Sequence, residues 1–190
     1  NCPNLVKAAC GNSITNLTGI YNGLQKLTTA VCGPNVVEFS YAYNDCISLV
    51  TPVAPGAKVV NMVGTYENCV KVNKATCGAN VINMSAAFRN CVNLQTAVVY
   101  NKVEDMSYAF ENCTNLKIAV CNDSVVNMYR AYHNCINLTN AACGKNVTNL
   151  HNVYTGCTNL TTAACGDKIT NLKGVYNDCP NLVNAACGNG

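Results

Sequence analysis

Hydrophobic and polar residues recur along this chain with a period of 22 residues, and several columns show the period at once. Leucine or valine fills one column in every unit: Leu5, Leu27, Leu49, Val72, Leu94, Leu116, Leu138, Leu160 and Leu182. Four further columns lie at fixed distances from it. Alanine dominates the first, valine the second, methionine or leucine the third, and aromatic residues the fourth. A unit this short cannot bury its own apolar side, whereas stacked copies join each column into a continuous core row. The pattern therefore predicts a repeat solenoid.

Each unit follows C-x-N-L-x-x-A-x-C-G-x-x-V-x-N-M-x-x-A-[YF]-x-N, and units begin near residues 2, 24, 46, 69, 91, 113, 135, 157 and 179. One extra residue enters between 46 and 69, and we place it in the turn at 55–58. Segments such as 116–121 predict one short parallel strand per unit, and the glycine that follows many of them predicts a turn. Segment 106–110 predicts a short helical or 3-10 turn that returns the chain. We expect a single repeat domain over 1–190 with about eight and a half rungs.

The repeat unit resembles the BspA-type bacterial leucine-rich repeat, whose units follow C-x-x-L-x-x-I-x-I-P-x-x-V-x-x-I-x-x-x-A-F. Residues 83–94, N-M-S-A-A-F-R-N-C-V-N-L, are similar to the N-M-x-x-M-F-x-x-C-x-x-L units of related surface proteins. The resemblance covers the whole chain and departs from the family at the strand, where alanine and cysteine replace isoleucine. It implies a leucine-rich-repeat-like β-solenoid. It also implies an extracellular, cell-surface or virion protein of bacterial or viral origin, used in adhesion or recognition, and it does not imply chemistry.

The composition excludes several protein classes. Hydrophobic residues make up 49% and charged residues 11% of the chain, which excludes a disordered chain and an ordinary charged surface. The net charge is +3 and the basic residues are scattered, so nucleic-acid binding is disfavoured. No apolar run approaches the ~18 residues of a membrane span, so no membrane insertion is expected. The first residues do not resemble a signal peptide, and the end rungs resemble interior ones. We expect flanking sequence or another chain to cover these end rungs.

Asparagine and aromatic columns predict ladders that run along the stack. Asparagine recurs in a column that includes Asn83, Asn127 and Asn149, and its amide can bond the rungs above and below. Exposed asparagines such as Asn73 and Asn140 suit sugar binding better. The aromatic column includes the following residues: Phe88, Phe110 and Tyr132. Several asparagines lie in glycosylation sequons, where glycans would break the ladders, which favours a bacterial or viral origin over a eukaryotic secretory one.

All fifteen cysteines fall into two columns, of which one includes Cys91, Cys113 and Cys135. Zinc sites use paired C-x₂₋₄-C spacings, and none is present here. Neighbours in a column approach the Cα separation of a disulfide, but their parallel side chains keep the Cβ atoms too far apart without strain. We therefore expect free thiols packed as small hydrophobic side chains. The odd count leaves at least one thiol unpaired within the chain in any case.

The chain offers little that could assemble into an active site. His133 lies two residues from Cys135, but that cysteine belongs to a core column. His151 shares a column with serines and a lysine, which indicates a solvated face. Glu104 and Asp105 are adjacent in a predicted strand and point to opposite sides. We therefore expect no enzyme activity, no cofactor and no metal site.

The strand residue between the alanine and second cysteine columns should point away from the core. That row is small and apolar over most of the stack, and its candidate interface residues are Val31, Val53, Thr76, Val98 and Val120. An exposed apolar stripe usually marks an interface. We expect this face to pack against protein, either a second copy or another domain, with ligands such as a host-surface receptor or glycan met at the turns. The predicted function is a non-catalytic binding module, and the alternative is a self-assembling component of a fibre, surface layer or virion.

Overall fold

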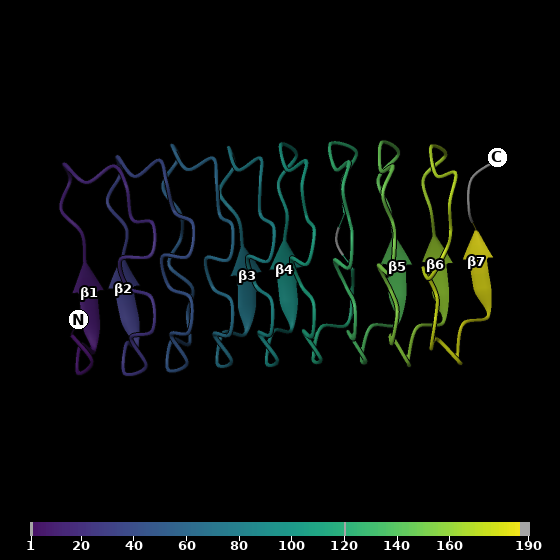
Figure 1. The fold of residues 1–190 in the computed structure, drawn as a ribbon, viewed down its shortest axis with the longest axis horizontal. Coiled ribbons are helices and arrows are strands. Elements are labelled where there is room, and N and C mark those ends of the chain that lie inside the picture. The colour runs from purple at the N-terminus through teal and green to yellow at the C-terminus, as the bar shows by residue number, and fades with distance from the viewer. Residues whose placement is uncertain (1, 120, 187–190) are drawn as a thin grey trace.

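A computed structural model describes residues 2–119 and 121–186 as a parallel β-solenoid whose rungs stand side by side in one row (Figure 1). Seven short strands lie along one side: β1 (Lys7–Ala9), β2 (Thr29–Val31), β3 (Lys74–Thr76), β4 (Thr96–Val98), β5 (Asn140–Ala142), β6 (Thr162–Ala164) and β7 (Asn184–Ala186). They form three parallel sheets, β1-β2, β3-β4 and β5-β6-β7. Within each sheet the alanines of successive units pair, for example Ala8 with Ala30 and Ala141 with Ala163. The repeat solenoid predicted from the 22-residue period is confirmed.

A second parallel ladder holds the rungs together on another side. It consists of single bridges along the column Asn16, Glu38, Asn61, Asn83, Asp105, Asn127 and Asn149. This ladder crosses the gaps between the three sheets, because its bridges include the pairs Glu38–Asn61 and Asp105–Asn127. The stack is therefore continuous where the strands are not.

The core consists of the columns that the period predicts. Valine, methionine, leucine and aromatic side chains of the interior rungs are almost fully buried. The aromatic rings stack in one file along the axis, with centroids 5.2 to 6.0 Å apart. That file consists of Tyr21, Tyr43, Tyr66, Phe88, Phe110, Tyr132, Tyr154 and Tyr176. Offset stacking at this distance is favourable for aromatic pairs beyond the area they bury.

The predicted helical or 3-10 turn is wrong, because no helix occurs among the described residues. Two columns of this segment have left-handed backbone in rung after rung, which a right-handed helix excludes. One column holds Gly19, Tyr41, Gly64, Ala86, Tyr108, Arg130, Asn152 and Gly174. The other holds Gly23, Asp45, Asn68, Asn90, Asn112, Asn134, Gly156 and Asp178. The segment is therefore a run of tight turns.

Backbone hydrogen bonds explain why this conformation is stable. In the first rung, alternate N–H groups donate to the next rung, for example Gly19 to Ser40 at 3.0 Å and Tyr21 to Ala42 at 3.0 Å. The N–H groups between them close local turns, for example Ile20 to Leu17 at 3.1 Å. A helix would direct every donor to its own segment, whereas this alternation divides the donors between the turn and the neighbouring rung.

Glycine after the second cysteine column allows rungs to approach closely. A Cβ atom added at Gly144 or Gly166 would collide with a backbone carbonyl oxygen of the preceding rung, that of Asn122 or Gly144 respectively. Glycine is therefore required here for close backbone packing.

Candidate interaction surfaces

The strand side of the solenoid exposes two rows of side chains. In most strands the central alanine points into the core and both flanking residues are exposed, as in β1, β5 and β6. One exposed row carries lysine, threonine, isoleucine and asparagine, and the other carries alanine, valine and threonine. This alternation is the one expected of a strand with a single buried face.

The structure places the five predicted interface residues in different environments. Val31 and Val98 point outward with 64% and 49% of their surface exposed, and Thr76 is half-buried. Val53 is buried, so the prediction that it belongs to the exposed row is wrong. Val120 lies outside the described residues. The apolar row is therefore interrupted in the third rung.

Pro52 and the extra residue of this rung explain the position of Val53. Proline has no N–H to donate to a ladder, and the structure assigns no strand at 51–53. Ala54, which occupies the cysteine column, is exposed while Val53 is buried, as a one-residue slip requires. The Val53 carbonyl oxygen accepts a hydrogen bond from the buried Tyr66 hydroxyl.

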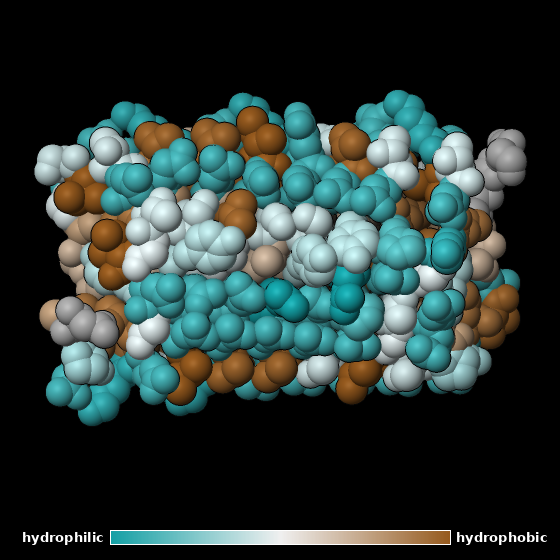
Figure 2. Space-filling model, viewed as in Figure 1, coloured by the Kyte–Doolittle hydropathy of each residue, from teal (hydrophilic) through white to brown (hydrophobic). Residues whose placement is uncertain are grey.

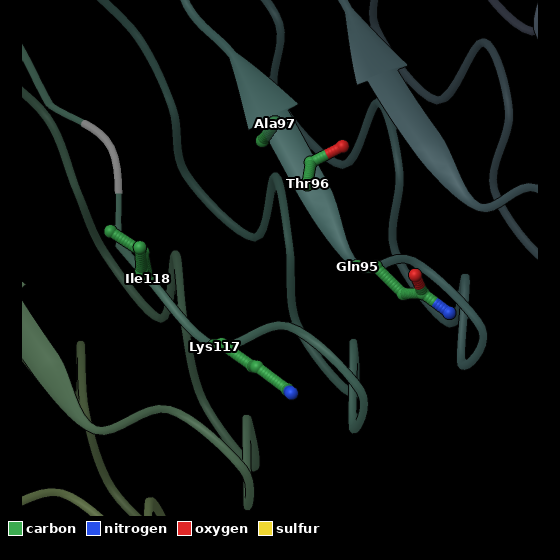
Figure 3. A pocket seen from close by; sticks show the side chains of 5 residues that line it. All are labelled: Gln95, Thr96, Ala97, Lys117 and Ile118. Atoms are coloured by element: carbon green, nitrogen blue, oxygen red, sulfur yellow. The ribbon is translucent and has the colours of Figure 1, made fainter.

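A shallow hollow lies on the strand side beside β4 (Figure 3). It is lined by Gln95, Thr96, Ala97, Lys117 and Ile118. Among the described residues, β4 pairs only with β3, and Ile118 bridges to Asn140 instead. The side chain of Ile118 is 61% exposed. The hollow thus adds the apolar side chain of Ile118 to the strand side, at a place where the described strands do not pair.

The first cysteine column forms a regular series of contacts. The thiols of Cys91, Cys113 and Cys135 each donate to the carbonyl oxygen of the aromatic residue one rung earlier, at 3.1 Å. The same carbonyl oxygen accepts the backbone N–H of the cysteine in its own rung, as in the Cys91-to-Phe88 bond of 3.1 Å. Every described cysteine is a free thiol in this structure. These thiols therefore serve as buried donors between rungs.

Burial makes these thiols poor nucleophiles. It raises the pKa of Cys46 to about 11 and that of Cys157 to about 12, and raises the pKa of Cys113 and Cys135 well above the ordinary value. A thiol reacts as the thiolate, so the fraction of reactive species at neutral pH is very small.

The asparagine column predicted from the sequence makes some of its hydrogen bonds between rungs and others within a rung. The Asn149 side chain donates to Asn127 at 3.0 Å, and Asn127 donates to Asp105 at 3.3 Å. The Asn83 and Asn127 side-chain oxygens also accept backbone N–H groups two residues later in their own rungs. This column therefore divides its bonds between the turn and the ladder.

A different asparagine column, which the sequence reasoning missed, is continuous. Asn68 donates to Asp45, Asn90 to Asn68, Asn112 to Asn90 and Asn134 to Asn112, at 2.7 to 3.0 Å. These residues also adopt left-handed backbone, which asparagine tolerates better than most residues. The final asparagine of the repeat pattern is the sequence signal that points to this ladder.

The turn side carries a cluster of charged and aromatic residues that the sequence reasoning also missed. The Glu111 carboxylate is 2% exposed and lies 2.6 Å from Arg89 Nε and 2.6 Å from Arg130 Nη2. Both guanidinium groups lie over the ring of Tyr108, at 5.6 and 5.9 Å from its centroid. His133 Nδ1 lies 3.6 Å from the same carboxylate. The only two arginines and the only two histidines of the chain fall in adjacent turn columns, which is the signal that could have located the cluster.

One long side of the molecule is shown by hydropathy in Figure 2. A hydrophilic band runs along most of its length, and a row of hydrophobic residues follows one edge. Similar side chains in successive rungs produce such bands. Within the described residues, no helix is long and apolar enough to span a bilayer, and no group of three or more His, Cys, Asp or Glu side chains is placed to hold a metal ion.

Solved structures with the same architecture are bacterial leucine-rich repeat proteins. The chain is similar to the Treponema pallidum leucine-rich repeat protein, with a TM-score of 0.63 and 21% identity over 73% of this chain and 68% of that one. It is also similar to a leucine-rich repeat protein from Bacteroides ovatus, with a TM-score of 0.51 and 11% identity over 98% of this chain. It spans 61% of the length of the Bacteroides protein. At these identities the likeness establishes the fold.

The family comparison agrees with the resemblance seen in the repeat unit. A comparison with curated protein sequences finds no match. The model of the BspA type leucine rich repeat region, which describes six copies, matches residues 1–117 and 80–188. The two matches together cover nearly the whole chain, so the chain belongs to the BspA-type leucine-rich repeat family.

Proposed function

We propose that this solenoid is a non-catalytic protein-binding module, displayed on a bacterial cell surface and used in adhesion or recognition. The observation that carries the proposal is the exposed strand side, where Val31, Val98 and Ile118 each have about half or more of their surface in contact with solvent. Exposed apolar rows on a rigid scaffold are typical of protein interfaces. Membership of the BspA-type repeat family supports the same proposal.

The contacts of the cysteines support a role without catalysis. Those of the first column are committed to hydrogen bonds between rungs, and burial holds their pKa values high. The Glu111 carboxylate is likewise engaged by two arginines. These side chains act as structural parts of the stack, so the proposal places the function on the exposed rows.

The experiment that tests the strand side replaces Val31 and Val98 with lysine. We expect the double variant to lose self-association or partner binding, since two charges would be buried in the interface. The matched control replaces Val37 and Val126, two exposed valines of another row, with lysine. Size-exclusion chromatography with light scattering measures self-association, and a pull-down on intact host cells or immobilised matrix proteins measures recognition. Unchanged behaviour of the first variant, or equal loss in the control, would contradict the proposal.

A second candidate function is assembly of copies into a fibre, surface layer or virion. The monotony of the apolar row favours it, because β5, β6 and β7 place alanine at the exposed position in three consecutive rungs. Concentration-dependent association of the wild type that the Val31→Lys/Val98→Lys variant loses would identify assembly as the function. A wild type that remains monomeric and binds a foreign protein would identify recognition.

A further inference from the structure

Sequence variation between rungs is concentrated on the turn side. Core columns repeat one to three residue types, because each side chain must fit the same space in every rung. Three turn columns differ from rung to rung, and most of their residues are exposed or half-buried, with Asn44, Ser107 and Glu111 among the buried exceptions. The first reads Thr18, Ser40, Val63, Ser85, Ser107, Tyr129, His151 and Lys173. The second is the left-handed column that includes Tyr108 and Arg130, and the third reads Asn22, Asn44, Glu67, Arg89, Glu111, His133, Thr155 and Asn177.

Positions that vary within an otherwise uniform repeat are free of the packing that fixes the others. On this chain they hold tyrosine and arginine, the residue types that dominate the binding energy of protein interfaces. The exposed strand row, in contrast, holds mainly alanine, valine and threonine. The turn side is therefore the side on which the residue types differ most from one rung to the next.

Glu111 holds the two arginines of this region in fixed positions. Its carboxylate oxygens lie 2.6 Å from Arg89 Nε and 2.6 Å from Arg130 Nη2, and Arg89 Nη1 lies 3.4 Å from Glu67. The two arginines lie against Tyr108, and their side chains are still 40% and 31% exposed. Side chains restrained in this way lose little conformational freedom when a ligand binds.

The aromatic rings of this region contact one another and the arginines. Both guanidinium groups lie over the ring of Tyr108, and this ring meets that of Tyr129 edge to face at 5.1 Å between centroids. Tyr129 stacks on His151 at 5.7 Å. These contacts already occupy part of the aromatic surface on which a sugar ring would stack, which favours a partner that binds through polar groups. The groups that remain free to bind are guanidinium, hydroxyl and imidazole, most of which donate hydrogen bonds.

Charge along these columns is uneven. Glu67 and Glu111 balance the two arginines at the end nearer the N-terminus. After Glu111, the three columns contain no acidic residue, and besides Arg130, whose charge Glu111 balances, they contain His133, His151 and Lys173. Among the described residues, Arg130 pairs with no carboxylate other than Glu111. The basic and donor groups follow one another in successive rungs along the axis, a length that an extended peptide of a few residues can span.

We propose that this turn patch, formed by Tyr108, Tyr129, Arg130, His151 and Lys173, binds an extended acidic segment of a partner protein. Carboxylates of the segment accept hydrogen bonds from the exposed guanidinium and ammonium groups, and its chain runs along the solenoid axis. The inference rests on the proposed function as a protein-binding module. It adds a recognition surface on the turn side to the one proposed on the strand side, and it specifies the partner's chemistry.

The test uses short random peptides displayed on phage and selected against the wild-type chain. Enriched peptides are then synthesised with a fluorescent label, and their Kd is measured by anisotropy. The test variant is Arg130→Ala/Lys173→Thr, since Ala86 and Thr18 occupy the same columns in other rungs. Glu111 keeps Arg89 as its partner in this variant. The matched control, Lys7→Thr/Lys74→Thr, removes the same charge from the strand side, where threonine already occurs.

We expect enriched peptides to contain Asp and Glu above the library frequency. Their Kd should rise at least about tenfold in the test variant and with salt, and less than about twofold in the control. Lys173→Glu provides a second variant at an exposed position should Arg130→Ala impair folding. Neutral enriched peptides, equal binding by the test variant, equal loss in the control, or a glycan that binds through Arg130 would each overturn the inference. Peptides that bind only the strand side leave the proposed function standing, whereas no enriched peptide at all contradicts both.

Discussion

The sulfur of Cys165 lies 2.9 Å from the hydroxyl oxygen of Tyr176, eleven residues later in the chain. Cys143 and Tyr154 repeat the contact one rung earlier at 3.4 Å. The pairing links the second cysteine column to the aromatic column. Where that cysteine column holds Val99, the aromatic column holds Phe110, which has no hydroxyl to satisfy. Two rungs depart from this pairing. Cys77 lies beside Phe88 and accepts the backbone N–H of Tyr100 at 3.3 Å, and Tyr66, whose rung has Ala54 in the cysteine column, donates to the Val53 carbonyl oxygen instead.

Phe110→Tyr should therefore destabilise the stack. The new hydroxyl would be buried beside Val99 without a partner, which costs about 1–3 kcal/mol. Adding Val99→Cys should recover most of the loss, because it recreates the pair seen at Cys143 and Tyr154. Urea unfolding of both single variants and the double variant measures the coupling. Strictly additive effects would show that the pairing of the two columns has no energetic basis.

Asn112 contributes to stability in two ways that two substitutions can separate. It bridges Asn90 and Asn134 in the amide ladder, and it has left-handed backbone with φ of 60°. Asn112→Gly removes only the ladder and should cost about 1 kcal/mol. Asn112→Ala also strains the backbone and should cost roughly 1 kcal/mol more. Equal unfolding free energies for the two variants would contradict the role assigned to the backbone.

The cysteines should be reduced and protected in the native protein. Those of the interior rungs, such as Cys91 and Cys113, are fully buried and have raised pKa values, whereas Cys2 is exposed. Titration with a thiol reagent at pH 8 should label few thiols before unfolding. After unfolding in guanidinium chloride without reductant, all fifteen should react. If unfolding left the number of labelled thiols as low as in the native protein, the remaining cysteines would be in disulfides and the prediction would be wrong.

Acidification should destabilise the fold through His133. Burial and the adjacent Arg130 lower the pKa of His133 below the ordinary value, and Glu111 only partly opposes them. The unfolded chain then takes up the proton first as pH falls below about 6.5, so this contribution to stability is complete above that pH and is lost below it. His133→Gln should unfold with a weaker dependence on pH between 7 and 5. The raised pKa of Glu67 acts in the opposite direction and is common to both proteins, so the difference between them isolates His133.

The repeat pattern was sufficient to predict the solenoid and its core, because a side chain that recurs at the same position must fill the same space. It could not predict the turn conformation. Left-handed backbone at Ala86, Tyr108 and Arg130 follows from bonds between rungs, and these residue types do not signal it. The burial of Val53 depends on Pro52 and one extra residue, whose effect on register appears only when rungs are stacked.

The strand side and the turn patch differ in how much of each could be predicted from the sequence. The outward position of Val31 and Val98 follows from strand alternation, which is a local property. The turn patch depends on residues from several rungs, and Arg89, Glu111 and Arg130 are 22 and 19 residues apart in succession. The columns that hold them differ from rung to rung, so a search for recurring residues passes over all three. Residues that break a repeat pattern are the ones that such a search needs to examine.

The alternating hydrogen bonds of the turn segments also determine how the molecule responds to tension. The first and last described rungs lie at opposite ends of the stack, and each described rung is bonded to the rungs beside it (Figure 1). A pull on the ends therefore loads the terminal rung first and detaches rungs in sequence. Each detached rung releases roughly 70 Å of extended chain. Under load the stack should therefore lengthen in steps while its remaining rungs stay folded.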